Sequence, residues 1–417
     1  MSFDIALSGI QAIDQQLDQI SNNIANAGTY GFKSTRDNFS ALYANGAQPN
    51  GTTIGSTSQS MNVAGGLLNT GDGLNAAING AGFFVVKDQT GTLNYTRVGI
   101  FTTSTDGFVT DATGRHVQGN VITPPSTVLG PVGDLTVPTG QIPAVASTKL
   151  TYVANLSADW TPPANTWVAP TPASPGVAAV DPDVSTYNFP KTSTLYDSLG
   201  VQHTLTQYFV KDATPGTLGG SVDVHYVVDG AEVGTPLTMT FDGNGQITNP
   251  VPATPAPALN ITGLADGAAD MTINFDYAGT TQFAGTTTVS TNQADGYASG
   301  NFNNILLSDD GSIVAKYSNG ASQTIGKLSV ATFANQGGLT AVDNTSWIAT
   351  TASGAANLSN AGVGQAGTLT TKALEQSNVD ITSELVGLMT SQRNYQANSK
   401  VIQTESTMLQ SLMQALQ

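Results

Sequence analysis

Apolar residues near the start of the chain recur at alternating steps of three and four positions. The positions are Phe3, Ala6, Ile10, Ile13, Leu17, Ile20 and Ile24, and the other side of the segment is rich in Gln and Asp. This alternation keeps one stripe of a helix apolar and is typical of a coiled-coil seam. It predicts an amphipathic helix that ends near residue 28.

The same spacing returns at the end of the chain. Its apolar positions are Ile381, Leu385, Leu388, Tyr395, Ile402, Leu409, Met413 and Leu416, with polar breaks at Gln392, Ser399 and Ser406. The pattern predicts a helix of roughly 35 residues, on the order of 50 Å long, with Asn378 or Asp380 as its N-cap.

A lone amphipathic helix is marginal in water, so each terminal helix needs a partner. We expect the two to pair as a coiled coil, with the apolar positions from Ile10 to Ile24 and from Ile381 to Leu416 forming this coiled-coil and polymerisation interface. The alternative is that each helix packs separately on the body of the protein. The spacing by itself leaves both arrangements open.

The middle of the chain has the pattern of β-strands. Segments such as "GFFVVKDQTGTLNYTR" place two apolar runs around a Gly-containing turn, and 45 glycines supply further turns. Pro-rich runs such as "WTPPANTWVAPTPASPG" interrupt the region after Leu150. We therefore predict a mainly β protein with α-helical termini, in which nested β domains are inserted between N- and C-terminal helices that pair as a coiled coil. The expected divisions are 1–28 with 368–417 (terminal helices), 29–63 (extended connector), 64–149 with 298–367 (inner β domain) and 150–297 (outer inserted β domain).

Composition narrows the function classes. Only 10% of the residues are charged, the net charge is −16, and a nucleic-acid partner would need a basic stripe that is not visible. The chain has no Cys, so disulfides and thiolate metal sites are excluded. Neither a secretory signal nor an apolar run of transmembrane length is visible, so no membrane insertion is expected. Export, if it occurs, would use a route that reads an unprocessed N-terminus.

Catalytic and cofactor motifs are weak. The three histidines, His116, His203 and His225, lie in separate strand or turn sequences, where a packed or solvated histidine is the simpler interpretation. "GVGQAG" (362–367) follows no buried strand, and "DGNG" (242–245) lacks the further ligands of a calcium loop. We predict no catalytic residue, no cofactor and no metal site, and hence no enzyme.

Three segments resemble the bacterial flagellar rod and hook proteins. The first is the "SNNIAN…T.GFK" motif near the N-terminus, the second is "INGAGFFVV" (78–86), and the third is the closing helix that begins at "VDITSELVGLMTSQ". The motif residues are Ser21, Asn22, Asn23, Ala25, Asn26, Thr29, Gly31, Phe32 and Lys33. Within this family, the length and the inserted domain are typical of hook subunits, and "STLYDSLGVQHTLTQYFVK" (193–211) is similar to a hook segment.

The asparagines of the motif allow two interpretations. Asparagine is a poor helix former, so its cost must be offset by hydrogen bonds to neighbouring subunits or by its use in ending the helix before Gly28. We expect both uses, and the resemblance favours subunit contacts. Phe32 is expected either to anchor the connector on a neighbouring helix or to pack locally.

The resemblance implies a structural function. The protein would polymerise with itself into the flexible, curved tube of the flagellar hook, a universal joint that transmits torque from rod to filament. Its partners would be further copies of itself, the rod, hook-cap and hook–filament junction proteins and the flagellar export apparatus, outside the cell and without signal cleavage. The alternatives are a distal rod subunit and, from another class, a secreted β-rich adhesin. The adhesin would leave the paired terminal heptads unexplained.

Overall fold

The computed structural model describes residues 2–43, 49–123, 128–173, 178–212, 220–251, 256–264 and 266–415. The chain divides into two compact units. Unit 1 comprises Met1–Thr139, Asn303–Lys316 and Ser322–Gln417, and unit 2 comprises Gly140–Phe302 and Tyr317–Ala321. Unit 2 is therefore an insertion within unit 1. Its limits lie outside the predicted 150–297 because antiparallel bridges, Ile142 with Gly300 and Val145 with Tyr297, draw the flanking segments into it.

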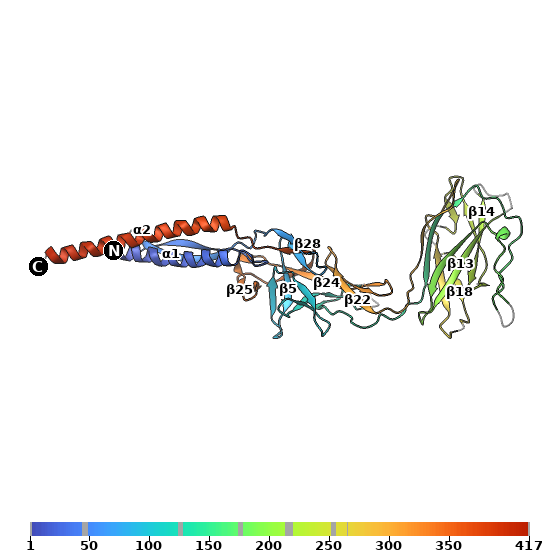
Figure 1. The fold of residues 1–417 in the computed structure, drawn as a ribbon, viewed down its shortest axis with the longest axis horizontal. Helices are drawn as coiled ribbons and strands as arrows, with labels where there is room; N and C mark the ends of the chain where they lie inside the picture. Colours follow the sequence, from blue (N-terminus) through green and yellow to red (C-terminus); the bar gives the residue numbers. More distant parts are fainter. Residues whose placement is uncertain are drawn as a thin grey trace. The chain divides into compact units, whose positions relative to one another are not determined.

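The two terminal helices belong to unit 1 and lie side by side (Figure 1). Helix α1 spans Ser2–Ala25 and α2 spans Ile381–Ala415. Asp380 caps α2, because its Oδ1 accepts hydrogen bonds from the amides of Thr382 and Ser383. The predicted pairing of the chain ends is confirmed, and α2 has the predicted length of 35 residues.

Much of the predicted connector is a β-hairpin. Strands β1 (Thr35–Tyr43) and β2 (Pro49–Gln59) pair antiparallel, and the hairpin packs on α1. Its residues are mostly Ser, Thr, Asn and Gly, so the sequence lacks the apolar alternation that would have indicated strands. Hydroxyl and amide side chains bond across the strands instead, as Thr57 Oγ1 does to Asp37 Oδ1 at 2.8 Å. The expectation of an extended connector over 29–63 is thus wrong for residues 35–59.

A twelve-stranded sheet forms the β body of unit 1. Its central path runs β22 (Phe302–Leu307), β23 (Ser312–Tyr317), β24 (Ser322–Thr332), β9 (His116–Val121), β5 (Phe83–Lys87), β6 (Leu93–Thr96), β26 (Ser346–Ile348) and β25 (Thr340–Val342). Beside this path lie β7 (Phe101–Thr103), β8 (Val109–Asp111), β10 (Val132–Asp134) and β27 (Asn357–Asn360). Edge-to-face aromatic contacts such as Phe83–Phe333, with centroids 6.0 Å apart, fill the adjoining core.

Two short ladders join the two halves of the chain next to the helices. Strand β3 (Leu67–Asn69) pairs with β29 (Ala373–Glu375), and β4 (Ala76–Asn79) pairs with β28 (Thr368–Thr371). These ladders place the segment that follows the hairpin against the segment that enters α2. Each terminal helix is therefore connected to the β body through paired strands.

Unit 2 contains two sheets that enclose one apolar core. The first contains β18 (Leu259–Ile261), β19 (Met271–Asp276), β11 (Lys149–Ser157), β20 (Thr281–Phe283) and β21 (Thr288–Ala294). The second contains β12 (Phe189–Tyr196), β13 (Gln202–Lys211), β14 (Ser221–Val228), β15 (Ala231–Glu232), β16 (Leu237–Phe241) and β17 (Ile247–Asn249). Strands of both sheets alternate buried and more exposed residues, as expected where one face of each sheet meets the core.

The first Pro-rich stretch of unit 2 is held on the second sheet by aromatic stacking. The ring of Trp167 lies 4.4 Å from that of His225 and 5.1 Å from that of Tyr208. Trp167 Nε1 and His225 Nδ1 both lie within hydrogen-bond distance of Glu232 Oε1, at 3.1 and 2.7 Å. The residues of this stretch that the structure describes are thus anchored by a tryptophan.

Candidate assembly interface

Helices α1 and α2 pair antiparallel in a single register. Asn23 Nδ2 donates to Glu384 Oε1 at 2.9 Å, and Ser391 Oγ donates to Gln16 Oε1 at 2.9 Å. Further towards the N-terminus of α1, Gly9 faces Asn398, because a Cβ on Gly9 would lie only 2.9 Å from Asn398 Nδ2. Each step back along α1 is therefore matched by an equal step forward along α2.

The contact between the helices passes through small and polar residues as well as the predicted apolar ones. On α1 the most enclosed positions include Ala6, Gly9, Ile13, Ile20 and Asn23. Of these, Ala6, Ile13 and Ile20 belong to the predicted seam and lie seven positions apart, whereas Gly9 and Asn23 lie outside it. At Gly9 the absence of a side chain leaves room for the Asn398 amide, which would lie only 2.9 Å from a Cβ there.

The intervening members of the predicted seam lie beside this contact. Ile10, Leu17 and Ile24 are half-buried, and on α2 Leu388 and Ile402 are half-buried as well. The more exposed predicted positions on α2 are Ile381, Leu385, Tyr395, Leu409 and Met413, and Leu416 lies outside the described residues. The pairing of the helices within one chain thus leaves much of the predicted interface uncovered.

The register leaves the end of α2 without α1 beside it. Because Gly9 faces Asn398, the first residue of α1 lies level with about residue 405, and residues 406–415 project roughly 15 Å further at 1.5 Å per residue. Figure 1 shows the end of α2 beyond the start of α1. We call residues 406–415 the overhang. Its four large apolar side chains, Met408, Leu409, Leu412 and Met413, are 57–65% exposed.

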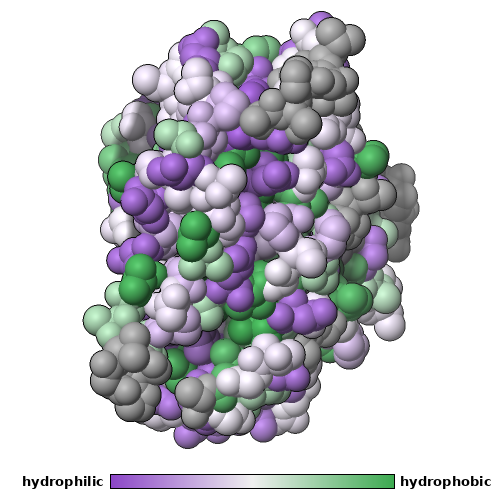
Figure 2. Space-filling model, turned by 90° about the vertical axis from the view of Figure 1, so that its right-hand side faces the viewer, coloured by the Kyte–Doolittle hydropathy of each residue, from purple (hydrophilic) through white to green (hydrophobic). Residues whose placement is uncertain are grey.

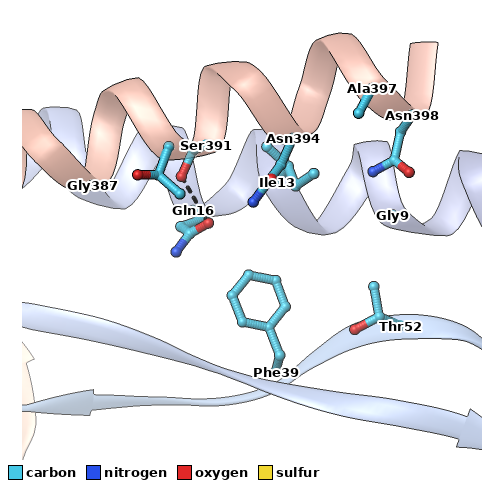
Figure 3. Close-up of a pocket in the computed structure, with 11 residues that line it drawn as sticks. Gly9, Ile13, Gln16, Phe39, Thr52, Gly387, Ser391, Asn394, Ala397 and Asn398 are labelled. Atoms are coloured by element: carbon cyan, nitrogen blue, oxygen red, sulfur yellow. Dashed lines mark hydrogen bonds between the residues drawn. The ribbon is translucent and has the colours of Figure 1, made fainter. Parts of the chain in front are cut away.

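A groove runs along the paired helices next to the hairpin (Figure 3). Its volume is about 510 Å³, and it is lined by residues of α1, α2 and both hairpin strands. Ile13 and Gln16 lie on the α1 side, Ala397 and Asn398 lie on α2, and Phe39 of β1 points towards the helices. We call this feature the hairpin groove.

The three asparagines of the N-terminal motif have different roles. Asn23 is 1% exposed and is bonded within the chain: Thr35 N donates to its Oδ1 at 3.0 Å, and its Nδ2 donates to Thr35 O at 2.8 Å as well as to Glu384. Asn26 closes the helix end, since its Nδ2 donates to Asn22 O and its Oδ1 accepts from Thr29 Oγ1. Asn23 is therefore not available for contact with a neighbouring subunit. Asn22 is exposed, so the predicted subunit contact remains open to it.

Lys33, the last residue of the motif, lies in a buried charge cluster. Its Nζ donates to Glu375 Oε1 at 2.6 Å and to Val63 O at 2.7 Å, and Arg97 Nη1 donates to Glu375 Oε2 at 3.2 Å. All three charged side chains are at most 3% exposed. Burial lowers the pKa of Lys33 although the Glu375 carboxylate opposes that effect, and burial also lowers the pKa of Arg97.

This cluster connects three separate segments at the base of the helices. Lys33 follows α1, Arg97 follows β6, and Glu375 ends β29 shortly before α2. The Gly65 amide and Lys33 share the same Glu375 oxygen, and the Gly31 amide donates to the Glu375 carbonyl at 2.8 Å. The cluster therefore fixes where both terminal helices leave the β body.

Phe32 and Asn22 line a second, smaller groove in unit 1. The groove has a volume of about 400 Å³ and lies between the end of α1 and the β25–β26 hairpin, whose Trp347 forms part of its lining. Phe32 is half-buried here. Packing on its own chain covers part of its surface, and both interpretations of Phe32 stay predictions.

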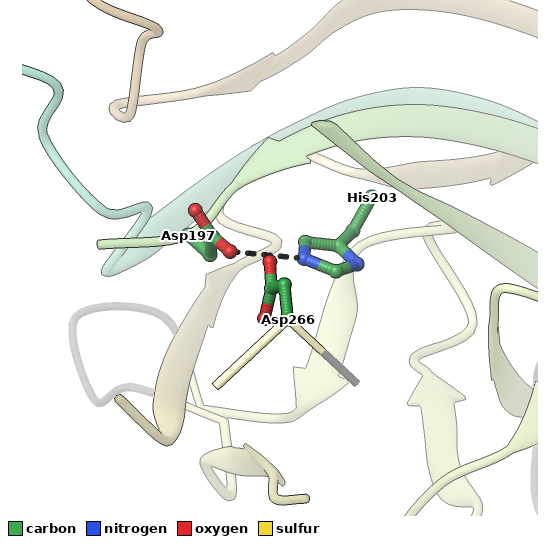
Figure 4. A group of neighbouring side chains, drawn as sticks. All are labelled: Asp197, His203 and Asp266. Carbon is green, nitrogen blue, oxygen red and sulfur yellow. Dashed lines mark hydrogen bonds and ion pairs between the residues drawn. The ribbon is translucent and has the colours of Figure 1, made fainter. Parts of the chain in front are cut away.

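The described histidines are paired with carboxylates. His203 Nδ1 lies 2.6 Å from Asp229 Oδ2, and its Nε2 lies 3.5 Å from Asp197 Oδ2. Asp266 lies beside this pair, and polar atoms of Asp197, His203 and Asp266 are within 4.8 Å of one another (Figure 4). Asp197 Oδ1 accepts from the amides of Leu199 and Val201, so backbone donors already satisfy one of its oxygens.

This group forms an ion-paired junction between loops of unit 2. Burial would lower the pKa of His203, but its hydrogen bonds to Asp229 and Asp197 outweigh burial and raise the pKa. Burial would likewise raise the pKa of Asp197, yet its hydrogen bond with Asp266 and those from the Val201 and Leu199 amides bring it below its usual value. The raised pKa keeps His203 protonated to a higher pH than an ordinary histidine.

Several residues of the interface were absent from the sequence prediction. Gly9, Gln16, Glu384 and Ser391 form the contact between the helices, and Glu375 is the centre of the charge cluster. A periodicity argument counts apolar residues, so it passes over glycine, glutamine and serine. An acidic residue directly after the apolar pair Ala373–Leu374 was a signal for a buried ion pair.

No helix in the described ranges has the length and apolar character to cross a membrane.

Four family matches together cover most of the chain. Residues 3–33 match "Flagella basal body rod protein", and residues 77–144 match "Flagellar hook protein FlgE/F/G D1 domain". Residues 155–297 match "Flagellar basal body protein FlaE D2 domain", and residues 370–415 match "Flagellar basal body rod FlgEFG protein C-terminal". The matched segments include both terminal helices and most of unit 2.

Whole-length relatives are flagellar hook proteins. The chain is 33% identical to flagellar hook protein FlgE of Salmonella typhimurium, with 99% of each chain covered, and 33% identical to that of Escherichia coli with the same coverage. It is 32% identical to FlgE of Treponema pallidum over 98% of this chain and 97% of the relative. A crystal structure of Helicobacter pylori flagellar hook protein FlgE2 has a similar fold, with a TM-score of 0.51 and 13% identity, over 74% of this chain and all of that one.

Proposed function

The chain belongs to the flagellar hook protein family, and on that premise we propose that its copies polymerise through the outward faces of α1 and α2. The resulting polymer is the flexible, curved tube of the hook, which acts as a universal joint between rod and filament. The chain serves as a structural subunit and not as an enzyme. The distal-rod and adhesin alternatives are set aside because its whole-length relatives are hook proteins.

The exposed apolar side chains of the paired helices carry this proposal. Monomeric proteins rarely expose large continuous apolar surfaces, and such surfaces mark interaction sites. Ile381, Leu385, Val386 and Met389 are each about half exposed on the first turns of α2, and the overhang exposes four more large apolar side chains. Contacts with neighbouring copies would remove these side chains from water.

The surface of unit 2 suits weaker contacts. In the view of Figure 2, hydrophobic residues occur in small groups separated by hydrophilic ones. Contacts between such surfaces bury little apolar area each, so neighbouring units can shift against one another at small cost. We propose that this unit permits the compression and extension that bending of a tube requires.

The proposed partners follow from the position of a hook in the flagellum. Copies of the chain contact one another along the tube, and those at its ends contact the rod, the hook cap and the hook–filament junction. The subunit reaches this place outside the cell through the flagellar export apparatus, without a cleaved signal peptide.

Two aspartate substitutions test the proposal at different interfaces. Ile13 is 7% exposed within the helix pair, whereas Leu385 is 48% exposed on its surface. Ile13→Asp buries a charge and should separate α1 from α2 in the free subunit, which loss of helical circular dichroism would reveal. Leu385→Asp should leave the free subunit folded and abolish polymerisation, measured by sedimentation and electron microscopy. Normal polymers from Leu385→Asp would contradict the proposal.

A further inference from the structure

We propose that the overhang of one copy, residues 406–415 of α2, docks in the hairpin groove of another copy. This inference rests on the proposed function, because it names the segment and the surface that meet in the polymer. The occupant is thus a helix of a second copy of this chain, and the receiving surface is formed by α1, α2 and the β1–β2 hairpin.

The overhang has an apolar face that its own chain leaves uncovered. Met408, Leu409, Leu412 and Met413 follow one another at helical spacing and are 57–65% exposed. The register with α1 stops at about residue 405, so α1 ends before it could cover them. A helical segment of this kind needs an apolar surface from elsewhere to be stable in water.

The hairpin groove offers such a surface where the helix pair and the hairpin diverge. Phe39 is 47% exposed and points across the groove towards the helices (Figure 3). Gly9, Gly387 and Ala397 have no side chain or only a methyl group, so they leave space on the helical side of the groove. Ile13 forms part of the same lining. The groove is continuous with the α1–α2 contact, because Gln16 and Ser391, which bond to each other across that contact, also line it.

The overhang and the hairpin groove are both uncharged. The overhang, "STMLQSLMQA", has no charged residue, and neither do the residues that line the groove. Docking therefore removes no charged group from water, which would otherwise oppose the contact. Thr390, Asn394 and Asn398 can bond to the Ser and Gln side chains that flank the apolar face of the overhang.

Other occupants of the overhang fit less well. An anionic lipid surface is bound through clusters of Lys and Arg, and residues 406–415 contain none. The hairpin groove of the same chain lies too far back along α2 for the straight helix to reach. A second copy displaced along the helix axis by roughly sixteen residues, about 25 Å, would bring the two surfaces together. Such a head-to-tail contact does not close on itself and so generates a helical polymer.

Disulfide cross-linking tests this contact directly, because the natural chain has no Cys. Copies carrying Ala397→Cys in the groove are mixed with differently tagged copies carrying Leu412→Cys, each as a minor component among wild-type chains. After polymerisation and oxidation, we expect disulfide-linked dimers that contain both tags. Gln392→Cys, exposed on α2 outside the groove lining, replaces Ala397→Cys in the control and should give at least tenfold less dimer.

The outcomes separate the inference from the proposed function. Polymers that form without the Ala397–Leu412 disulfide, or with as much disulfide in the Gln392 control, would overturn the groove contact and leave polymerisation intact. Failure of the wild-type chain to polymerise would overturn both. Binding of the chain to phosphatidylserine vesicles that is lost in Leu412→Ser would assign the overhang to a lipid surface and also refute the inference.

A second measurement uses the aromatic residue of the groove. Phe39→Ala should raise the critical concentration for polymerisation about tenfold, because an aromatic anchor in an interface pocket is lost. Leu93→Ala removes a side chain that is 40% exposed on the β body and should change it less than twofold. Thermal unfolding of both free subunits checks that they are folded. An unchanged critical concentration in a folded Phe39→Ala subunit would contradict the proposed contact.

Discussion

Individual side chains determine how the terminal helices are joined to the rest of the hook subunit. Lys33 belongs to the motif by which the N-terminus resembles its family, and its contribution is a buried ion pair with Glu375. Arg97 adds a second cation to the same carboxylate, and its Nη2 also donates to Gly80 O at 2.8 Å. A motif residue that could have contacted a neighbouring subunit is instead committed within its own chain.

Glu375→Gln should strongly destabilise unit 1. The substitution leaves Lys33 and Arg97 buried without a counter-ion, and loss of one partner from a buried pair costs about 3–5 kcal/mol. Calorimetry should show a lower unfolding temperature for unit 1 and an unchanged transition for unit 2. Glu405→Gln, a half-buried residue on α2, is the matched control and should change neither transition by much. Equal stability of the two variants would argue against a structural role for the cluster.

His203 should make the stability of unit 2 depend on pH. Because its folded pKa is raised, its ion pairs stabilise the fold fully below the unfolded value of about 6.5, and this contribution is lost as the pH rises through the folded pKa. The Asp197 pKa is lowered, so its contribution is present above the unfolded value and lost as the pH falls through the folded pKa. The unfolding temperature of unit 2 should therefore fall between mildly acidic and mildly alkaline pH. His203→Gln should remove that fall, and an identical pH profile in the variant would exclude the explanation.

Among the secondary-structure elements, the antiparallel pair of α1 and α2 depends on small residues. Glycine inside a helix costs about 1 kcal/mol relative to alanine, so Gly9 and Gly387 need a compensating gain. That gain is the fit of side chains from the facing helix, because Asn398 lies against Gly9 and Ile20 lies against Gly387. The bonds of Gln16 to Ser391 and of Asn23 to Glu384 lie in the same register. The large apolar side chains of the heptad pattern are thereby released for other contacts.

Gly9→Leu should weaken the pairing of the terminal helices. A Cβ at Gly9 would already lie within 2.9 Å of Asn398 Nδ2, so a leucine must displace the Asn398 side chain or α2 itself, at a cost of roughly 1–3 kcal/mol. Amide hydrogen exchange in α1 should become faster. Gln11→Leu places the same side chain on the exposed face of α1 and should leave the exchange rates nearly unchanged. Slower or equal exchange in Gly9→Leu would contradict the close contact between Gly9 and Asn398.

The molecule as a whole is a nested chain in which unit 2 is an insertion. The segments that enter and leave unit 2 are bridged at Ile142 with Gly300 and at Val145 with Tyr297. The two ends of the insertion are therefore adjacent, and a short turn can replace it. An insertion with adjacent ends places little constraint on the fold of the unit that receives it.

Removal of residues 142–300, joined by a two- to four-residue Gly/Ser turn, should leave unit 1 folded. Calorimetry should show one transition within a few degrees of the unit 1 transition in the full chain. The shortened subunit should still polymerise, and the bending stiffness of its polymer, measured from curvature in electron micrographs, should differ from that of the full chain. Loss of the unit 1 transition would mean that the two units depend on each other for folding.

The sequence by itself determined the terminal helices, the β-rich middle, the family and the absence of thiol chemistry. These properties follow from local periodicity, turn residues and motifs, which neighbouring positions encode. The antiparallel register, the role of Asn23 and the Lys33–Glu375–Arg97 cluster were decided only in the tertiary structure. Each depends on contacts between residues more than 200 positions apart. A heptad spacing does not reveal which partner covers the helix, because the spacing is the same for every partner. The β1–β2 hairpin was missed for a related reason, since polar strands that pack on a helix carry no apolar alternation of their own.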